Sequence, residues 1–177
     1  MENQRVRLTK IMLKSALMEL LKEKPIEKIS IRELCSRAEI NHTTFYKHYG
    51  SQHELLEEIE ADYFHELEAC LLEDGLESPD GLNSALHFIG REKERWKVLI
   101  NAVHEEEFVK RIFSLPVISR LFNEHLSYVH DESTGMYVRL FLCHGGYAII
   151  RQWINNETGD PPEEISALIW SLIKKLI

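Results

Sequence analysis

The N-terminal third of the chain contains two serines, Ser30 and Ser51, that are each followed three residues later by a glutamate. In this arrangement the serine oxygen accepts an amide of the first helical turn, and the glutamate reaches back toward the preceding backbone. Asn41, between them, is another favoured N-cap residue. The caps predict two short helices, at about 30–38 and 42–48, and then a long helix that begins at Ser51.

Apolar residues recur at helical spacing along the rest of the chain, and no stretch alternates as a half-buried strand would. Pro25 marks the end of a first helix, and a break is expected at about 75–81. The pattern predicts further helices at about 82–93, 95–103, 105–129 with a bend at Pro116, 136–156 and 162–176. We therefore expect an all-α protein of about nine helices, with an N-terminal domain at 1–50 and a helical bundle at 51–177.

Composition indicates a globular chain, because 44% of the residues are apolar and 28% are charged. Neither a secretory signal nor an apolar run long enough to span a membrane is visible. Cys35, Cys70 and Cys143 are odd in number and far apart, which argues against a disulfide framework or a zinc site. We expect a cytoplasmic protein without a metal or other cofactor.

Charge is divided unevenly along the chain, whose formal net charge is −8. Residues 1–50 contain ten Lys and Arg against six Asp and Glu, whereas residues 51–177 contain eleven against twenty-three. A basic N-terminal part on an acidic body suits a protein that turns one face toward phosphates.

Two short helices joined by a tight turn are typical of a helix-turn-helix unit, in which the second helix enters the major groove of DNA. The predicted helix at 42–48 is rich in groups that can hydrogen-bond phosphates or base edges. Phe45 should face the other way, toward Leu34 and the first helix, and Tyr49 should join that core.

The run from Ile29 to Leu56 resembles the TetR family of bacterial one-component regulators, and the likeness extends over about 50 residues. Thr44-Phe45-Tyr46-Lys47-His48-Tyr49 matches the end of that family's recognition helix, and Ser51 to Leu56 matches the start of its fourth helix. The run 140–156 is also similar to a subgroup related to regulators of dihydroxyacetone kinase operons, some of which activate transcription.

The resemblance implies DNA contacts at specific positions. Thr44, Tyr46 and His48 would contact phosphates or bases, and Arg32 would do so from the start of the preceding helix. The variable positions that tend to read sequence are occupied by His42, Thr43 and Lys47. A solvated side chain remains the alternative for Lys47, and a surface ion pair remains the alternative for Arg32.

Two positions depart from the family pattern. Glu39 stands in the turn where the family usually has glycine, and a glutamate held at positive φ costs about 1 kcal/mol. Gln52 stands where the family usually has a lysine that binds phosphate, which should flatten the salt dependence of DNA binding by about one counterion.

The last two predicted helices carry broad apolar sides, and the first of them contains two adjacent glycines. Pairing with a twofold mate would cover these sides and form a homodimer that reads an inverted repeat. The alternative is that they complete the core of one chain. The expected interface consists of Gly145, Gly146, Ile149, Trp153, Leu168, Ile169, Leu172 and Ile173.

An effector pocket is expected in the bundle, because TetR-like regulators respond to ligands bound there. Aromatic residues at helical spacing serve as core more often than as pocket, so both interpretations stay open. The expected pocket residues are Trp96, Phe122, Tyr137, Phe141, His144 and Tyr147. The favoured function is a repressor that a small molecule releases. One alternative is an activator or co-regulator that acts through protein contacts. An enzyme is a further alternative, but the sequence contains no recognisable catalytic motif.

Overall fold

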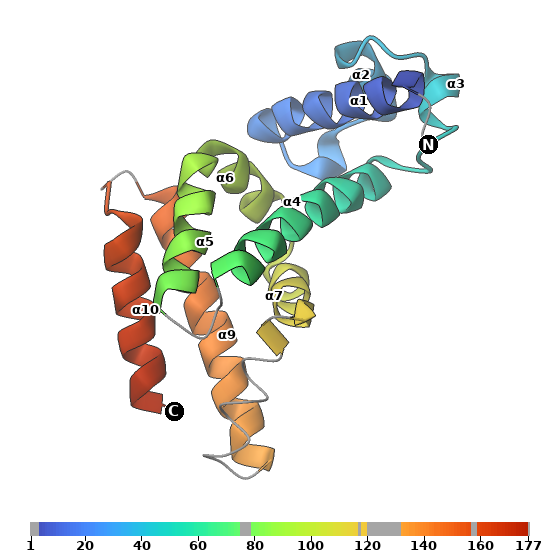
Figure 1. Cartoon of the computed structure of the whole chain (residues 1–177). Helices are drawn as coiled ribbons and strands as arrows, with labels where there is room; N and C mark the ends of the chain where they lie inside the picture. The colour runs from blue at the N-terminus through green and yellow to red at the C-terminus, as the bar shows by residue number, and fades with distance from the viewer. Residues whose placement is uncertain (1–3, 75–78, 117, 120–131, 157–158, 177) are drawn as a thin grey trace. The chain divides into compact units, whose positions relative to one another are not determined.

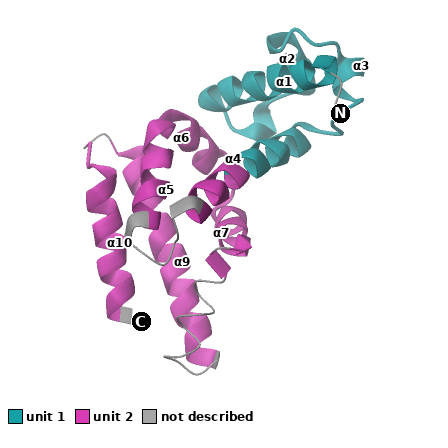
Figure 2. Cartoon of the chain, in the orientation of Figure 1, with its two compact units in different colours: residues 1–63 teal, residues 64–177 magenta. Residues whose placement is uncertain are grey.

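The computed structural model describes residues 4–74, 79–116, 118–119, 132–156 and 159–176 (Figure 1). These residues form nine α-helices and one short 3-10 helix and contain no strand, which confirms the predicted all-α class. The chain divides into two compact units, residues 1–63 and 64–177 (Figure 2). No described helix is both long and apolar enough to cross a membrane.

Unit 1 is built from short helices packed around a small apolar core. Its core side chains, among them Leu13, Leu17, Leu34, Phe45 and Leu55, are fully enclosed. The elements are α1 (Gln4–Glu23), η1 (Ile26–Lys28), α2 (Ile31–Arg37), α3 (His42–Phe45) and the first part of α4 (Gln52–Asp74).

The predicted caps begin α2, α3 and α4. The Oγ atoms of Ser30 and Ser51 each accept the amide of the glutamate three residues later at 3.2 Å, and Asn41 Oδ1 accepts the Thr43 amide at 2.8 Å. The two glutamates differ from each other, since only the second reaches back to the backbone before its helix. Glu33 binds the Lys24 ammonium, and Glu54 accepts the Gly50 amide at 2.6 Å.

Helix α2 ends in a Schellman motif whose left-handed residue is Glu39, at φ 54°. The Ile40 amide donates to the Cys35 carbonyl at 2.9 Å, and the Glu39 amide donates to the Ser36 carbonyl at 3.3 Å. Among the described residues Glu39 is the only one besides glycine with positive φ. The strain expected from the sequence is therefore present in the turn between α2 and α3.

Unit 2 is a helical bundle in which α10 packs on α5 and α9, while α6 and α7 also pack on α9. Its core includes Leu86, Trp96, Leu99 and Phe108, each at most 2% exposed. The helices are the second part of α4, α5 (Pro79–Arg91), α6 (Lys93–Ala102), α7 (Glu105–Ser114), α9 (Glu132–Asn155) and α10 (Pro162–Leu176).

Several helix ends differ from the prediction. The helix expected to bend at Pro116 instead ends at Ser114, because a residue that precedes proline is driven out of the helical region, and Leu115 is extended at ψ 127°. The remainder of the predicted 105–129 helix lies mostly outside the described residues. Helix α9 begins at Glu132, four residues earlier than expected. Helix α3 ends at Phe45, although i→i+3 bonds continue the turn to His48.

The two units meet within α4, further along the chain than the expected domain boundary after residue 50. The first turns of α4 belong to unit 1 because Glu58 and Asp62 form ion pairs with α1. Sequence periodicity could not reveal these pairs, since they join residues far apart in the chain.

Candidate nucleic-acid interface and ligand cavity

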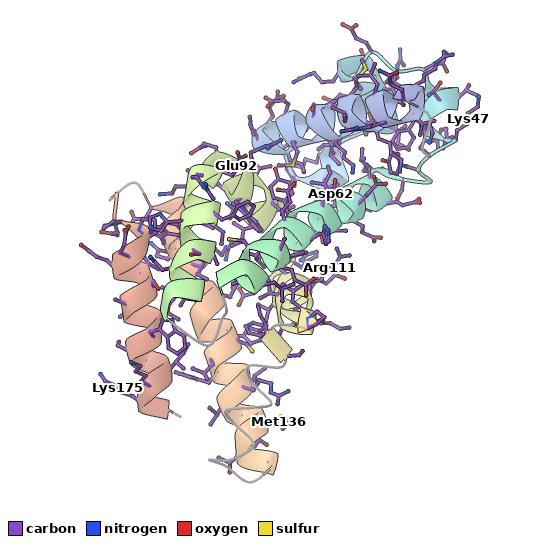
Figure 3. All side chains as sticks on the ribbon, viewed as in Figure 1. Lys47, Asp62, Glu92, Arg111, Met136 and Lys175 are labelled. Atoms are coloured by element: carbon purple, nitrogen blue, oxygen red, sulfur yellow. The ribbon has the colours of Figure 1, made fainter. Side chains whose placement is uncertain are left out.

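The outer surface of α2 and α3 gathers the residues expected to contact DNA. Tyr46 is 59% exposed, so it is not part of the core of unit 1. Figure 3 shows Lys47 at the α3 end of the unit, with its side chain directed away from α1. Arg32, His42 and Thr43 are also exposed, whereas Thr44 and His48 are half-buried.

The inner side of the same segment is apolar, as predicted. Phe45 is fully enclosed and Tyr49 is 3% exposed. The Phe45 ring packs edge-on against Tyr46, with 5.5 Å between the ring centroids, and its centroid lies 5.8 Å from that of Tyr49. One side of a single helical turn therefore anchors the segment, while the other presents hydrogen-bonding groups to solvent.

An ion-pair cluster, which we call the α1–α4 clasp, joins Lys10 and Lys14 to Glu58 and Asp62. Lys14 Nζ lies 2.7 Å from Glu58 Oε1 and 2.6 Å from Asp62 Oδ2, and Lys10 Nζ lies 3.3 Å from Glu58 Oε2. Burial alone would raise the pKa of Glu58, but the hydrogen bonds from Lys14 and Lys10 outweigh it and hold that pKa below its usual value. The clasp fixes the start of α4 on α1.

Ion pairing also reduces the positive charge that unit 1 can offer to phosphates. Besides the clasp, Lys24 pairs with Glu33 at 2.6 Å, and Arg37 pairs with Glu23 at 3.1 Å. No ion pair within the described residues involves Lys47 or Arg32. Lys47 and Arg32, which both lie on the predicted DNA-binding face, can therefore offer their charges to phosphates.

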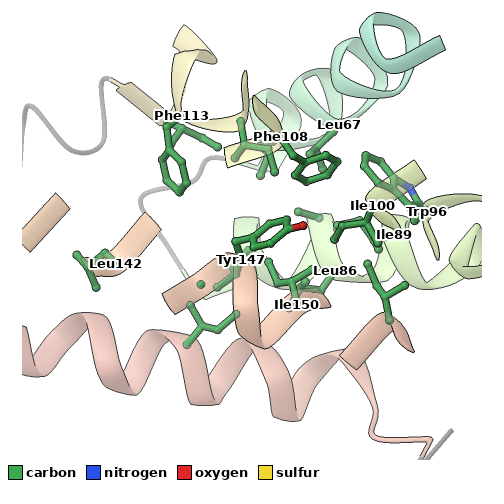
Figure 4. Close-up of a pocket in the computed structure, with 18 of the residues that line it drawn as sticks. Leu67, Leu86, Ile89, Trp96, Ile100, Phe108, Phe113, Leu142, Tyr147 and Ile150 are labelled. Carbon is green, nitrogen blue, oxygen red and sulfur yellow. The ribbon is translucent and has the colours of Figure 1, made fainter. Parts of the chain in front are cut away.

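Unit 2 contains a cavity of about 150 Å³ between its helices (Figure 4). Side chains from all of its described helices contribute to the wall. Ten of the lining residues are Leu67, Leu86, Ile89, Trp96, Ile100, Phe108, Phe113, Leu142, Tyr147 and Ile150. Every described lining residue is apolar or aromatic or is Gly146, so this part of the wall offers no charged group to a ligand.

The expected pocket residues divide into two groups. Trp96 and Tyr147 line the cavity. Tyr137 and Phe141 do not line it and are instead 63% and 65% exposed on α9. His144 also lies outside the lining, with its Nδ1 atom 3.5 Å from Glu105 Oε1, and Phe122 falls outside the described residues.

The expected dimer residues also occupy different environments. Leu168 and Leu172 are 46% and 40% exposed on α10, whereas Ile169 and Trp153 are buried. Trp153 packs near Gly90, and its indole Nε1 donates to the Asp160 carbonyl at 2.8 Å. Gly145 and Ile149 are half-buried, while Gly146 and Ile173 line the cavity.

The two helical glycines do not serve a close approach between helices of one chain. A Cβ atom added to Gly145 or Gly146 would meet no heavy atom of the described residues within 4 Å beyond its own helix backbone and chain neighbours. Close helix packing, which the adjacent glycines suggest in the sequence, is therefore not their role within one chain. Each glycine instead leaves space beside α9, and the space beside Gly146 is part of the cavity.

Sequence reasoning missed the aliphatic part of the cavity wall and the clasp. Leu86, Ile89 and Ile150 follow the same helical spacing as ordinary core residues, so no pattern separates a cavity wall from a filled core. Among the described residues no cluster of three or more His, Cys, Asp or Glu side chains is arranged to hold a metal ion. Burial raises the pKa of the Cys143 thiol to about 12, so that thiol is unreactive.

Comparisons with known proteins agree with this architecture. Residues 13–59 match the family profile described as bacterial regulatory proteins of the TetR family. Residues 77–175, more than half of the chain, match a profile described as a transcriptional regulator C-terminal region.

One relative is the uncharacterized HTH-type transcriptional regulator YxbF of Bacillus subtilis (strain 168), with 26% identity over 171 residues. The alignment covers 92% of this chain and 44% of the relative, so the chain spans less than half of that protein's length.

Two solved structures share the fold across 96% of each chain. One is a TetR transcriptional regulator from Streptococcus agalactiae 2603V, with a TM-score of 0.76 and 20% identity. The other is the dihydroxyacetone kinase operon activator DhaS, with a TM-score of 0.58 and 18% identity. The two family profiles, together with the helix-turn-helix geometry, show that this chain belongs to the TetR family of DNA-binding transcriptional regulators.

Proposed function

We propose that this regulator represses transcription by binding an inverted-repeat operator as a homodimer. Residues 1–50 supply the DNA contacts, and residues 51–177 supply the dimer interface and the effector site. The observation that carries the proposal is the two-sided α3 segment, in which buried Phe45 holds exposed Tyr46 and Lys47 outward. Such a regulator works in the cytoplasm, where bacterial DNA lies.

The DNA contacts follow from the chemistry of the exposed face. Tyr46 and the half-buried Thr44 and His48 offer hydrogen bonds to phosphates and base edges, and Arg32 adds charge to the phosphate contacts. His42, Thr43 and Lys47, all exposed, would read base edges in the major groove.

Dimerisation is supported by apolar surface that one chain leaves exposed on its last helices. Leu168 and Leu172 lie one turn apart on α10, and the space beside Gly145 on α9 would admit another helix. Large apolar side chains grouped in this way usually mark an interaction surface. Two copies joined here would place two recognition segments on one duplex.

An effector role for the cavity is supported by its volume and by its apolar wall. A ligand that fills about 150 Å³ of this space would bury its apolar surface against that wall and would bind through the hydrophobic effect. It would release DNA if it binds the DNA-free conformation more tightly.

The alternative is an activator or co-regulator that works mainly through protein contacts. It is favoured by the clasp, which neutralises Lys10 and Lys14, and by Gln52 in place of a phosphate-binding lysine. The structural neighbour DhaS is itself described as an operon activator. This alternative expects weak DNA binding that changes little with salt.

The test is fluorescence-anisotropy binding to duplexes from the DNA upstream of the gene, with wild type and Tyr46→Ala. A hydrogen bond to a charged phosphate contributes about 1.5 kcal/mol, and a dimer would lose two of them, so we expect affinity to fall by on the order of a hundredfold. Tyr137→Ala, which removes an equally exposed tyrosine from unit 2, is the matched control and should bind normally. Equal DNA affinity of Tyr46→Ala and wild type would show that Tyr46 does not contact DNA and would contradict the proposed role of α3.

A further inference from the structure

The cavity wall of unit 2 contains few polar atoms among the residues that the structure describes. In this part of the wall, the side-chain atoms able to hydrogen-bond are the Tyr147 hydroxyl and the indole N–H groups of Trp96 and Trp170. No Asp, Glu, Lys, Arg or His is among the described residues that line it. An ionised ligand group would therefore lose its hydration without gaining a counter-charge.

Gly146 determines how much space the α9 side of the cavity leaves. It sits in the middle of a helix, where glycine is unfavourable by about 1 kcal/mol relative to alanine. No described neighbouring helix lies close enough to require glycine here, because an added Cβ atom would have no contact within 4 Å. Gly146 lines the cavity, so any larger residue there would occupy the volume open to a ligand.

Tyr147 supplies a hydroxyl group to the wall of this space. Figure 4 shows its hydroxyl directed into the cavity from α9, between the surrounding aliphatic side chains. The ring is fixed in place, since its centroid lies 5.4 Å from that of Phe108 and the residue is 5% exposed. The hydroxyl is therefore held where it can meet a polar group of a bound molecule.

Trp170 adds a second hydrogen-bond donor on the α10 side of the wall. Its Nε1 atom is enclosed and has no acceptor among the described residues. Buried polar groups in proteins are normally hydrogen-bonded, so a donor left without an acceptor in a cavity wall suits a ligand that brings one.

We propose that the cavity binds a compact, uncharged and largely apolar molecule, such as a single aromatic ring with one hydrogen-bonding group. Cavities of about this volume with Leu, Ile and Phe walls accept benzene-sized guests. The apolar body of the ligand lies against Gly146 and the aliphatic wall, and its one polar group meets the Tyr147 hydroxyl. This ligand class rests on the effector role proposed above.

Isothermal titration calorimetry with three probes of similar shape tests the proposal: toluene, 4-methylphenol and 4-methylbenzoate. We expect both uncharged probes to bind, 4-methylphenol about fivefold more tightly because of one hydrogen bond. The carboxylate should bind at least about a hundredfold more weakly than 4-methylphenol, because its charge cannot be solvated inside the wall. Equal binding of 4-methylbenzoate and 4-methylphenol would overturn the proposal.

Two variants locate the binding within the cavity. Tyr147→Phe should remove the preference for 4-methylphenol over toluene. Gly146→Leu should weaken the binding of both uncharged probes by at least about tenfold, because the new side chain fills part of the space, and Gly146→Ala should do so to a smaller degree. Ala148→Leu is the matched control, because it adds a side chain of the same size at an exposed position of α9 that does not line the cavity. Unchanged binding by Gly146→Leu would contradict the assignment.

The ligand class and the effector role are separated by adding the probes to the DNA-binding assay. Binding of 4-methylphenol without any change in DNA affinity supports the ligand class and rejects the effector role. Absence of binding by both uncharged probes, in a protein that still binds its operator, overturns the ligand class and leaves the regulator intact.

Discussion

Glu39 closes helix α2 in a backbone conformation that residues with a Cβ atom adopt only at a cost. Its φ of 54° is required by the Schellman motif, in which the Ile40 amide returns to the Cys35 carbonyl. The turn that follows sets where α3 begins. A strained residue therefore lies in the segment that positions the DNA-binding face.

Replacing Glu39 with glycine should stabilise the protein. The left-handed conformation costs a residue with a Cβ about 1–2 kcal/mol, part of which is offset by the greater freedom of glycine in the unfolded chain. We expect Glu39→Gly to raise the free energy of unfolding, measured by urea denaturation, by about 0.5–1 kcal/mol. Glu39→Ala keeps the Cβ and should bring no such gain. If Glu39→Ala raised the free energy of unfolding by the same amount, the effect would come from loss of the carboxylate rather than from relief of backbone strain.

Local features at the residue scale were predictable from sequence because they depend on near neighbours. Ser30, Asn41 and Ser51 cap the helices expected of them, and the buried side of Phe45 follows from its position in the turn. The second half of the capping box forms at α4, where Glu54 reaches back to the Gly50 amide, but it does not form at α2. Glu33 binds Lys24, whose proximity depends on how α1 packs, and that is not encoded in local spacing.

At the scale of elements, the α1–α4 clasp ties the recognition unit to the long helix. Glu58 has a lowered pKa, so its contribution to stability is present above its ordinary value of 4.5 and is lost as pH falls through the folded-state pKa. Burial opposes the charged form of Lys14, but its hydrogen bonds to Asp62 and Glu58 together outweigh burial and raise its pKa. The contribution of Lys14 is therefore lost only at alkaline pH.

Glu58→Gln should lower the melting temperature at neutral pH by a few degrees. The difference from wild type should shrink as pH falls below about 4.5, where Glu58 begins to protonate in the unfolded chain. Thermal unfolding followed by circular dichroism across this pH range measures both. Glu57→Gln, an exposed neighbour on α4, is the control and should melt like wild type. A pH-independent difference for Glu58→Gln would mean that packing rather than charge explains the loss.

Helix ends were less predictable than the helices themselves. The sequence predicted a bend at Pro116, but the effect of this proline on the preceding residue ends α7 at Ser114. Conversely, α9 begins at Glu132 within a polar stretch that resembles a loop, and the first turns of this helix are mostly exposed.

At the scale of the whole molecule, the sequence predicted a pocket and a dimer surface in the bundle but mixed their residues. Tyr137 and Phe141 lie on the surface, while Gly146 and Ile173 line the cavity. Both roles use apolar residues at helical spacing. Only the three-dimensional arrangement of the helices in unit 2 separates wall, core and surface.

Leu168→Glu should convert the protein to a monomer without unfolding it. The side chain is 46% exposed in one chain, so a charge is tolerated there but would be buried without a partner in the dimer. Size-exclusion chromatography with light scattering measures the change. Leu72→Glu alters a leucine that is 59% exposed on α4 and should leave the dimer unchanged. A wild-type protein that is already monomeric would reject the proposed interface.

The most direct test of the central claim is a salt series of anisotropy titrations on the upstream duplex that contains an inverted repeat. We predict saturable binding, with a logarithm of the binding constant that falls linearly with the logarithm of salt concentration. Gln52→Lys should steepen the slope by about one for each additional phosphate that the new lysine neutralises. A folded, dimeric protein that binds no duplex at low salt, or binds with an affinity independent of salt, would contradict the account.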